Sequence, residues 1–577
     1  MRRTKIVCTI GPASESRERV QELLTAGMDV ARLNFSHGTH EEHGARIAVL
    51  REEAAKQGKH LAVLLDTKGP EIRTGIVSEQ GVELVNGATF VLDTDLKQLG
   101  DTERVGITYK DLWREVGLDT HILIDDGQID LEVLSSETGR IVTIVRNGGV
   151  LKSQKGLNVP EREIRLPAVT EQDIEDIQFG INQGIDFIAA SFTRKAEDVI
   201  SVRRVVEEAG ANVKIIAKIE SREGIKNIDS ILEAADGLMV ARGDLGVEIP
   251  VEEVPVYQKE MIRKCNLWGK PVIVATQMLD SMIRQPRPTR AEASDVANAI
   301  LDGADAIMLS GETAAGRFPI EAVKMMDKIA LRTEKAHWEN RSSRHPQLNV
   351  AEAISYASYT IAEDLAAAAI LTPTQSGMTP YMISKYRPKA LIIGATPFST
   401  VARQLSLAWG VVSLLVPESA GTDELLSVSV NTAFAKGLVQ SGDVVVVTAG
   451  VPVGKAGTTN MIKVQVVGNM LAKGIGFGRK AYSGHARPVV RPTDEFQEGD
   501  VLVTSMTDAS FIPLLTKAGA LVVEEGGMTS HAAIAALQFG IPAIVGAHGI
   551  LNLIKPGQML TVDALAGVVY EGAVSIL

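Results

Sequence analysis

Short apolar runs and longer amphipathic segments alternate from Lys5 to about Ala336. The longer segments begin with polar residues, carry apolar residues three and four positions apart and end near glycine, which predicts helices. Eight strand-then-helix units favour a closed parallel (β/α)8 barrel, with an open doubly wound sheet as the alternative. The eight predicted strands are KIVCTIG, VARLNFS, LAVLLDTKG, DFIAASF, KIIAKIE, GLMVARGD, PVIVATQ and AIMLSGE.

The alternation is interrupted once, where period-two patterns such as ATFVLDT and HILIDDGQIDLEV predict strands. We therefore expect a β-rich domain at residues 70–167, inserted into a barrel formed by residues 1–69 and 168–345. The insertion leaves from the carboxyl end of a strand, where barrel enzymes hold their active sites, and this favours a lid. A β-domain that only decorates the barrel is the alternative.

Two more α/β segments follow the barrel. We expect one domain at residues 346–473, with five apolar strands, and a small one at residues 474–577. The second begins with a glycine-rich joint, KGIGFGRKAYSG, and holds four short strands around the helical segment SHAAIAALQFG.

The composition of the chain argues against some classes of function. A chain of 577 residues with 45% apolar and 23% charged residues is ordinary for a globular protein of several domains. Its net charge of −12 repels polyanions, so we expect no nucleic-acid partner. No apolar stretch approaches the ~20 residues that span a bilayer, so we expect no membrane insertion. Only Cys8 and Cys265 are present, without metal-type spacing, which favours reduced thiols and a cytoplasmic location.

Polar residues gather where the predicted barrel strands end, which is where barrel enzymes keep their chemistry. Glu220 and Asp244 are carboxylates on adjacent strands without His or Cys beside them, which suits Mg²⁺ or Mn²⁺. Arg32, Lys218 and Arg73 add positive charge in an acidic protein, which indicates a phosphorylated or carboxylated substrate. A structural ion pair between Lys218 and Glu220 is the alternative.

Longer motifs carry a specific resemblance. IIAKIESREGI, RLNFSHG, DTKGPEIRTG, MVARGDLGVE, VATQMLDSM and MLSGETA are similar to the segments of the pyruvate kinase family, in the same order along the chain. The resemblance covers roughly residues 1–473. It implies transfer of the phosphoryl group of phosphoenolpyruvate to ADP, giving pyruvate and ATP in the last step of glycolysis. It also implies a barrel with a lid, an α/β regulatory domain that binds a phosphorylated effector, and a homotetramer.

The resemblance assigns roles residue by residue. It implies that Arg32 and Lys218 contact the phosphate of phosphoenolpyruvate, that Gly243 and Thr276 contact its carboxylate, and that Glu220 and Asp244 hold the divalent metal. Glu71 matches the position where an acid accompanies dependence on K⁺, so we expect K⁺ as a second cofactor. The K⁺ ligands it implies are Asn34, Ser36, Asp66 and Thr67, and the nucleotide contacts are Asn34, His37, Arg73 and Lys155.

Phosphoryl transfer requires neutralisation of the charge on the migrating group, which Lys218, Arg32 and bound cations supply. The enolate that remains needs a proton. No strand-end His is suitably placed, so we expect a water relayed by the hydroxyls of Thr276 and Ser310, with His37 as the alternative donor.

Hydroxyls and a glycine follow the first strand of the 346–473 domain at the start of a helix, where backbone N–H groups attract phosphate. The resemblance implies an effector pocket there, closed by the later loop VPVGKAGTTN. We favour a sugar monophosphate or AMP, although fructose bisphosphate fits as well, and a plain helix cap is the alternative. The residues concerned are Thr374, Ser376, Gly377, Thr379 and Lys455.

The last segment has a resemblance of its own. GGMTSHAAI, followed by FGIPAIVG, is similar to the swivelling phosphohistidine domain of phosphotransferases that use phosphoenolpyruvate. His531, beside Thr529, matches the histidine that carries phosphate there. The chain shows no partner domain for a second transfer, so we favour a structural or regulatory remnant and keep phosphorylation of His531 as the alternative.

Two other functions compete with this interpretation. A metal-dependent lyase or aldolase acting on pyruvate would also place carboxylates and Arg at barrel strand ends, but the lid and the DTKGPEIRTG segment argue against it. A catalytically inactive sensor would keep the effector pocket, and the intact metal carboxylates with Lys218 argue against that.

Overall fold

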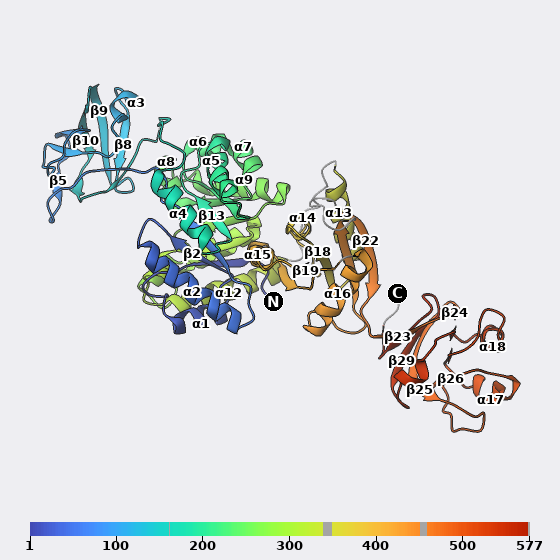
Figure 1. The fold of residues 1–577 in the computed structure, drawn as a ribbon. Coiled ribbons are helices and arrows are strands. Elements are labelled where there is room, and N and C mark those ends of the chain that lie inside the picture. Colours follow the sequence, from blue (N-terminus) through green and yellow to red (C-terminus); the bar gives the residue numbers. More distant parts are fainter. Residues whose placement is uncertain (161, 338–348, 420, 451–458, 575–577) are drawn as a thin grey trace. The chain divides into compact units, whose positions relative to one another are not determined.

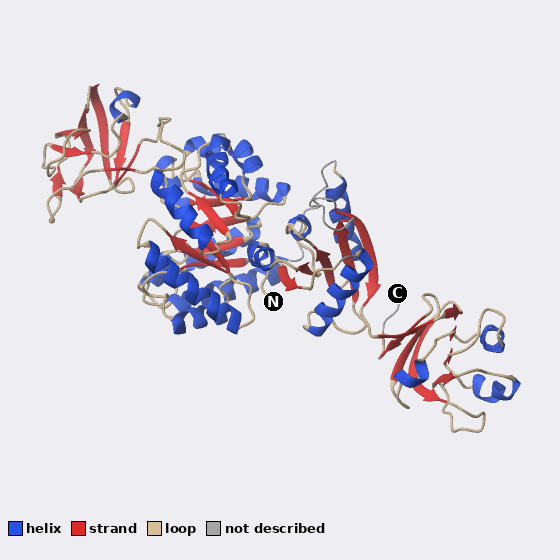
Figure 2. Cartoon of the chain, viewed as in Figure 1, coloured by secondary structure: helices blue, strands red, loops and turns tan. Residues whose placement is uncertain are grey.

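The computed structural model describes residues 1–160, 162–337, 349–419, 421–450 and 459–574. The chain divides into two compact units: Met1–Arg344 with Pro380–Arg387 and Phe398–Ser413, and His345–Thr379 with Pro388–Pro397 and Leu414–Leu577. Figure 1 traces the elements along the sequence, and Figure 2 shows that the inserted domain consists mostly of strands and loops, with the short helix α3 (Leu112–Glu115) beside its sheet. None of the described helices has the length and apolar character needed to cross a membrane.

The first unit contains a closed barrel of parallel strands, which confirms the predicted (β/α)8 fold and all eight predicted strands. Alternate strand residues face the inside, where Val7, Leu64 and Ile216 pack with other apolar residues, while their neighbours pack against the outer helices. In barrel order the strands are β1 (Lys5–Thr9), β17 (Ala306–Leu309), β16 (Val272–Ala275), β15 (Gly237–Ala241), β14 (Lys214–Ile219), β13 (Phe187–Ala190), β3 (Ala62–Asp66) and β2 (Val30–Asn34).

Capping residues define where several barrel helices begin. Thr39 and Thr289 accept hydrogen bonds from the backbone N–H three residues later, and Glu42 and Glu292 bond back to the cap backbone. The helices of this region are α1 (Arg17–Ala26), α2 (His40–Lys56), α4 (Glu171–Asn182), α5 (Ala196–Glu208), α6 (Arg222–Lys226), α7 (Ile228–Ala234), α8 (Arg242–Glu248), α9 (Val254–Trp268), α10 (Arg290–Asp302), α11 (Gly311–Ala314) and α12 (Pro319–His337), with the 3-10 helix η1 (Asp280–Ile283).

The insertion after β3 is β-rich, as predicted. It has its own core, in which Leu92, Leu131 and Ile141 are fully buried, so it can act as one body. Its seven-stranded sheet runs β4 (Ile72–Arg73), β12 (Gly156–Asn158), β8 (His121–Ile124), β9 (Ile129–Glu137), β10 (Arg140–Asn147), β6 (Thr89–Asp93) and β7 (Arg104–Gly106); β11 (Gly149–Leu151) pairs with β5 (Val82–Leu84), and α3 is Leu112–Glu115.

A five-stranded sheet forms the next α/β region, and all five predicted strands are present. The strands β19, β18 and β21 are parallel, and β22 pairs antiparallel with β21 and stands at the edge. The order is β20 (Val411–Leu415), β19 (Leu391–Thr396), β18 (Ala369–Pro373), β21 (Val444–Gly450) and β22 (Thr459–Val466). The helices are α13 (Val350–Asp364), α14 (Met378–Ser384), α15 (Ser399–Gln404) and α16 (Thr422–Ala435), with the 3-10 helix η2 (Leu405–Leu407).

The C-terminal region holds more strands than the sequence predicted. The segment interpreted as a glycine-rich joint forms β24 (Ile475–Phe477) and the start of β25 (Ala481–Pro488), because β28 and β29 supply antiparallel partners for them. The sheet runs β23 (Met470–Lys473), β30 (Val568–Glu571), β29 (Met559–Asp563), β25, β26 (Val501–Thr504), β27 (Ala520–Val523), β28 (Ala543–Val545) and β24, with α17 (Ile512–Leu515), α18 (His531–Phe539), α19 (Ile550–Leu553) and the 3-10 helix η3 (Ala509–Phe511).

Candidate active site

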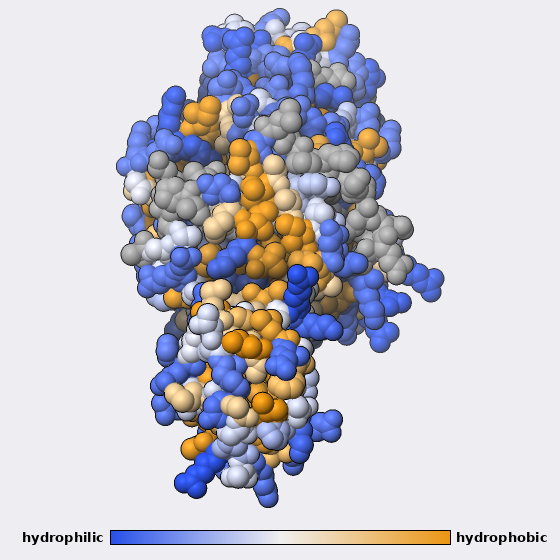
Figure 3. Space-filling model, turned by 90° about the vertical axis from the view of Figure 1, so that its right-hand side faces the viewer, coloured by the Kyte–Doolittle hydropathy of each residue, from blue (hydrophilic) through white to orange (hydrophobic). Residues whose placement is uncertain are grey.

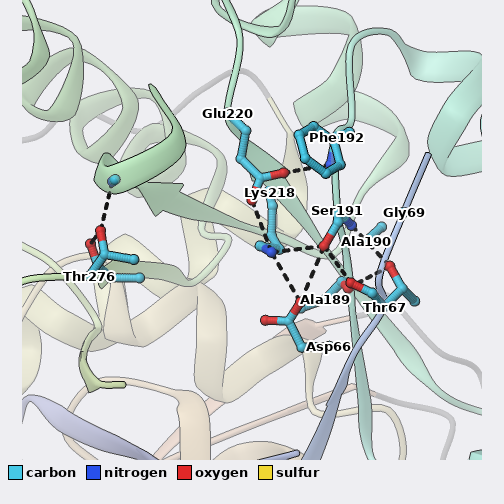
Figure 4. Close-up of polar contacts among 12 residues, drawn as sticks. Asp66, Thr67, Gly69, Ala189, Ala190, Ser191, Phe192, Lys218, Glu220 and Thr276 are labelled. Carbon is cyan, nitrogen blue, oxygen red and sulfur yellow. Dashed lines mark hydrogen bonds and ion pairs between the residues drawn. The ribbon is translucent and has the colours of Figure 1, made fainter. Parts of the chain in front are cut away.

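Lys218 is the centre of a polar network at the carboxyl end of the barrel strands (Figure 4). Its Nζ donates to Asp66 Oδ1 at 3.0 Å and to Ser191 Oγ at 2.8 Å, and it lies 2.9 Å from Glu220 Oε1. Ile216, two residues earlier on β14, packs in the barrel interior, so Lys218 faces the same way. Its side chain is 12% exposed, which leaves it within reach of a small ligand.

Arg32 joins this network from β2. Its Nε donates to Asp66 Oδ2 at 2.6 Å, and its Nη1 donates to Thr9 Oγ1 at 3.0 Å. Burial alone would raise the pKa of Asp66, but the charges of Arg32 and Lys218 lower it below its ordinary value. Asp66 therefore stays ionised and holds the side chains of Arg32 and Lys218 together at the barrel mouth.

The charge state of Lys218 follows from its partners. Burial alone would lower the pKa of Lys218, but the carboxylates of Asp66 and Glu220 raise it above its ordinary value. Lys218 is therefore an ammonium group near neutral pH. It can stabilise negative charge, and it is a poor base.

Glu220 and Asp244 line one cavity of about 260 Å³, together with Asp126 of the insertion. Burial raises the pKa of Glu220; the charge of Lys218 lowers this pKa, and the charge of Asp244 raises it further. Burial also raises the pKa of Asp244. A divalent cation would relieve this cost of ionisation, and an all-oxygen donor set fits Mg²⁺ or Mn²⁺. No group of three or more His, Cys, Asp or Glu suited to a metal occurs among the described residues.

The four residues assigned to K⁺ come from two neighbouring strand ends. Asn34 and Asp66 are register partners on β2 and β3. Asn34 Oδ1 accepts from the backbone N–H of Ser36 at 3.2 Å, and the Thr67 hydroxyl accepts from the N–H of Ser191 at 3.1 Å. The donors are oxygens only, which suits a hard cation. Their role as K⁺ ligands remains a prediction.

Thr276 belongs to a separate network, as Figure 4 shows. Its backbone has φ of 69°, which is rare for a β-branched residue and places strain at this turn. The turn is held because the Thr276 hydroxyl accepts from the N–H of Gly243 at 2.8 Å, while Arg242 Nη2 donates to the Thr276 carbonyl at 2.7 Å. The structure thus brings Gly243 and Thr276 together, and within the described part of the chain no hydrogen bond joins either of them to Lys218. Their contact with the substrate carboxylate stays a prediction.

The two candidates for the proton relay differ in environment. The Ser310 hydroxyl is buried and has no hydrogen-bond partner among the described residues, and Ser310 follows β17, which is beside β16. His37 is exposed, and its carbonyl accepts from His43 Nε2 at 2.8 Å. An unpaired buried hydroxyl beside the Thr276 turn is suited to bind a ligand or a water molecule.

Arg73 and Lys155, the predicted nucleotide contacts, lie on the insertion and outside the Lys218 network. Strands β4 and β12 make them neighbours, with Arg73 opposite Gly156. Arg73 Nη2 lies 2.6 Å from Glu71 Oε2, and Lys155 Nζ lies 2.8 Å from Asp125 Oδ1. Each cation is thus partly neutralised by an acid of the insertion.

Sequence reasoning missed Ser191 and Phe192, which follow β13. Ser191 Oγ donates to the Thr67 carbonyl at 2.6 Å and accepts from Lys218, and the N–H of Phe192 donates to Glu220 Oε2 at 2.6 Å. The signal was the end of the fourth predicted strand, DFIAASF, where a hydroxyl follows an apolar run as it does at the other strand ends.

The predicted effector loop precedes α14. Thr374 Oγ1 accepts from the N–H of Gly377 at 2.9 Å, and the Thr379 hydroxyl is buried and bonds to Thr459 Oγ1 at 2.8 Å. Thr379 therefore ties the loop to β22. Ser376 is partly exposed, and Lys455 lies outside the described residues.

His531 is the first residue of α18, and Ser530 caps this helix by accepting from the N–H of Ala533. Its Nδ1 lies 3.1 Å from Thr507 Oγ1. Thr529 is exposed. The imidazole is therefore oriented by a hydroxyl at a helix start, an arrangement compatible with both a phosphate carrier and a remnant.

Three family profiles match successive parts of the chain. Residues 1–323 match the profile described as pyruvate kinase, barrel domain, and residues 352–465 match pyruvate kinase, alpha/beta domain. Residues 496–567 match PEP-utilising enzyme, mobile domain.

Curated proteins match along the whole length. The chain is 56% identical to the pyruvate kinase of Geobacillus stearothermophilus over 588 aligned residues, and 52% identical to that of Bacillus licheniformis over 587. Each alignment covers 100% of both chains.

Proposed function

Because the chain belongs to the pyruvate kinase family, and is therefore a phosphotransferase acting on phosphoenolpyruvate and ADP, we propose which of its residues carry the reaction. Lys218 and Arg32 bind the phosphate of phosphoenolpyruvate, and Lys218 holds the enolate oxygen once the phosphoryl group has left. The observation that carries this proposal is the network in which Asp66 joins the ammonium and the guanidinium. Asp66 fixes their positions before substrate arrives, so little reorganisation is needed.

Glu220 and Asp244 hold Mg²⁺ or Mn²⁺, and the strand-end oxygens of Asn34, Ser36, Asp66 and Thr67 hold K⁺. Two cations, Lys218 and Arg32, face three carboxylates here, so the side chains alone do not favour an anionic substrate. When bound, the metals supply the missing positive charge and polarise phosphate oxygens. Arg73 and Lys155 then bind the nucleotide phosphates from the lid.

The enolate is protonated by water relayed through the Thr276 turn. Gly243 and Thr276 orient the substrate carboxylate, and the unpaired hydroxyl of Ser310 holds the water. The proton moves from this water to the methylene carbon of the enolate, which gives pyruvate, and a proton from bulk solvent restores the water.

The test is Lys218→Met, which keeps the length of the stem and removes the charge. We expect kcat to fall by at least 10³-fold, because the developing enolate loses its nearest cation. A coupled assay for pyruvate release from phosphoenolpyruvate and ADP measures this. Lys264→Met, which removes a lysine whose partner Asp229 is an exposed residue of α7, is the control and should keep wild-type turnover. Wild-type turnover in the Lys218 variant would remove Lys218 from the mechanism.

Allosteric regulation by a phosphorylated metabolite is the second part of the proposal. The support is the loop at Thr374–Gly377, where a hydroxyl and backbone N–H groups precede α14, and where Thr379 connects the loop to β22. Turnover at subsaturating phosphoenolpyruvate, measured with ribose 5-phosphate, AMP or fructose bisphosphate, tests it. Activation that survives Ser376→Asp, which would repel phosphate, would contradict this location.

A homotetramer in the cytoplasm completes the proposal. β22 is an edge strand whose Met461, Ile462 and Val464 are not buried, and such an edge favours pairing with a second copy. Figure 3 shows that apolar side chains gather on the face that it presents. The buried, unpaired thiols of Cys8 and Cys265 fit a reducing compartment. Light scattering of wild type and of Val464→Lys should show a smaller assembly for the variant; equal masses would contradict this edge.

A further inference from the structure

The loop Ser191–Arg194 lies beside both connections between the barrel and the insertion. The outgoing connection passes Gly69, where an added Cβ would lie 2.9 Å from Phe192 Cδ2 and 2.9 Å from Ser191 Cβ. The returning connection passes Ile164 and Leu166, whose carbonyls accept from Arg194 Nη1 at 2.7 Å and Nη2 at 2.8 Å. One loop of four residues therefore contacts both hinges.

The contact with the returning hinge depends on the shape of arginine. The carbonyls of Ile164 and Leu166 belong to a tight turn in which the N–H of Leu166 donates to the Ile164 carbonyl at 2.9 Å, and the planar fork of the guanidinium reaches both carbonyls. The Arg194 side chain is only 12% exposed, and its Nε lies 3.6 Å from Asp198 Oδ2. A lysine carries all its donors on one nitrogen, so it would not reproduce this contact, which two nitrogens of a planar group make.

Hydrogen bonds to neighbouring elements hold the loop in its conformation. The N–H of Arg194 donates to Asp198 Oδ2 at 2.9 Å, its carbonyl accepts from Asn227 Nδ2 at 2.9 Å, and the Thr193 hydroxyl donates to the Ala190 carbonyl at 2.9 Å. Phe192 has φ of 53°, a left-handed conformation that these surrounding contacts maintain. A displacement at either hinge is therefore not absorbed within the loop.

The same loop touches the catalytic network. Phe192 donates its N–H to Glu220 Oε2 at 2.6 Å, and Ser191 Oγ accepts from Lys218 Nζ at 2.8 Å. Figure 4 shows both residues between Gly69 and the Lys218 network. The angle of the hinges and the orientation of Glu220 therefore both depend on the contacts of this loop.

We propose that Ser191–Arg194 is the pivot of the lid, and that Arg194 is a positioning residue which fixes the returning hinge. The loop sets both the angle between the lid and the barrel and the orientation of Glu220. The proposal deepens the proposed function and rests on it, because the lid matters to catalysis only if phosphoryl transfer occurs at the barrel mouth.

The test uses the full-length chain with Arg194→Met, which removes the fork. The control is Arg203→Met on the same helix region, since Arg203 also donates to a carbonyl, that of Ala234 at 3.1 Å, and pairs with Asp236 at 2.8 Å, away from the hinges. Two quantities are measured: hydrogen exchange of the backbone amides of residues 162–168, and kcat with KM for both substrates.

For Arg194→Met we expect exchange over 162–168 to be at least tenfold faster, kcat at least 20-fold lower and KM for ADP at least fivefold higher. KM for phosphoenolpyruvate should change less than threefold, because Arg32 and Lys218 lie on the barrel. For Arg203→Met all of these should stay within twofold. Arg194→Lys keeps the charge without the fork; it should show faster exchange too, and it carries the test if the methionine variant does not fold.

If hydrogen exchange over residues 162–168 were as slow in both Arg194 variants as in the wild type, the proposal of a pivot would be overturned. So would equal changes in Arg203→Met, which would indicate general destabilisation, or a loss of turnover without faster hinge exchange. If the wild-type chain itself released no pyruvate, the proposed function would fail, while the difference in exchange between Arg194→Met and Arg203→Met would still decide whether Arg194 holds the hinge.

Discussion

The pKa values of several buried charged residues in this chain are set by the charged groups that they contact. Asp66 and Lys218 each have a shifted pKa because a buried opposite charge outweighs the cost of desolvation. Glu220 shows the reverse balance, since burial and Asp244 outweigh Lys218 and its pKa is raised. This contrast separates Asp66, whose charge is balanced by two basic side chains, from Glu220, whose charge is not fully balanced by Lys218.

The same principle operates at a structural carboxylate. Asp236 accepts from Arg203 and from the N–H of Ile215 at 2.9 Å, and lies 3.3 Å from Lys214. Burial alone would raise its pKa, but these partners lower it below the ordinary value of 3.8. A lowered folded-state pKa stabilises the fold above the unfolded-state pKa, and this contribution is lost as the pH falls through the folded-state value.

We therefore predict that Asp236→Asn lowers the free energy of unfolding at pH 7 by about 2 kcal/mol, the size of a hydrogen bond to a charged group. The difference from wild type should persist at pH 5 and shrink below about pH 4, as Asp236 of the wild type becomes protonated. Urea unfolding at several pH values measures it. Asp229→Asn, which removes an exposed pair with Lys264, should cost less than about 0.5 kcal/mol. A difference that does not depend on pH below 4 would contradict this explanation.

At the scale of elements, function is concentrated where strands become loops. β2, β3 and β14 contribute the Lys218 network, while the turns after β13 and β16 contain residues with positive φ, Phe192 and Thr276. Strained conformations persist only where surrounding contacts determine them. The contacts of Arg242 and of Glu220 do so here.

Gly69 allows a direct test at this scale. It has φ of +73°, and an added Cβ would press on Phe192 and Ser191. We predict that Gly69→Ala costs about 1–2 kcal/mol of stability through the left-handed backbone, and that it also lowers kcat at least tenfold by displacing the loop that holds Glu220. Thermal unfolding and the coupled assay measure the two effects.

Gly58→Ala is the matched control, because Gly58 has φ of +63° but no atom within 4 Å of an added Cβ. It should lose about 1–2 kcal/mol of stability through the left-handed backbone alone and keep wild-type kcat. Equal kcat in the two variants would show that the contact of Gly69 with the loop has no catalytic consequence.

At the scale of the molecule, the chain combines a complete barrel, a β-rich insertion and two further sheets, each with its own core. The region that matches a mobile PEP-utilising domain presents His531 at the start of α18. The hydrogen-bond partner of His531, Thr507, belongs to the same region. We interpret the region as a structural or regulatory remnant.

This interpretation predicts that His531→Gln keeps kcat within twofold of wild type and that no acid-labile phosphate forms on the chain. Incubation with phosphoenolpyruvate, followed by phosphate analysis at neutral and acidic pH, measures this, and Thr507→Val serves as a second variant that removes the partner of the imidazole. Acid-labile phosphate present in the wild type and absent from His531→Gln would establish phosphorylation instead.

The sequence alone determined the barrel, its eight strands, the β-rich insertion and the family, because the spacing of apolar residues and the long motifs are local properties of the sequence. It also indicated Lys218, Arg32, Glu220 and Asp244, since strand ends of a barrel converge. Only the tertiary structure decided that Ser191 and Phe192 complete the network, and that the glycine-rich joint at 473–484 forms strands. These features depend on backbone hydrogen bonds between segments far apart in the chain, and such bonds leave no periodic trace in the sequence of either partner.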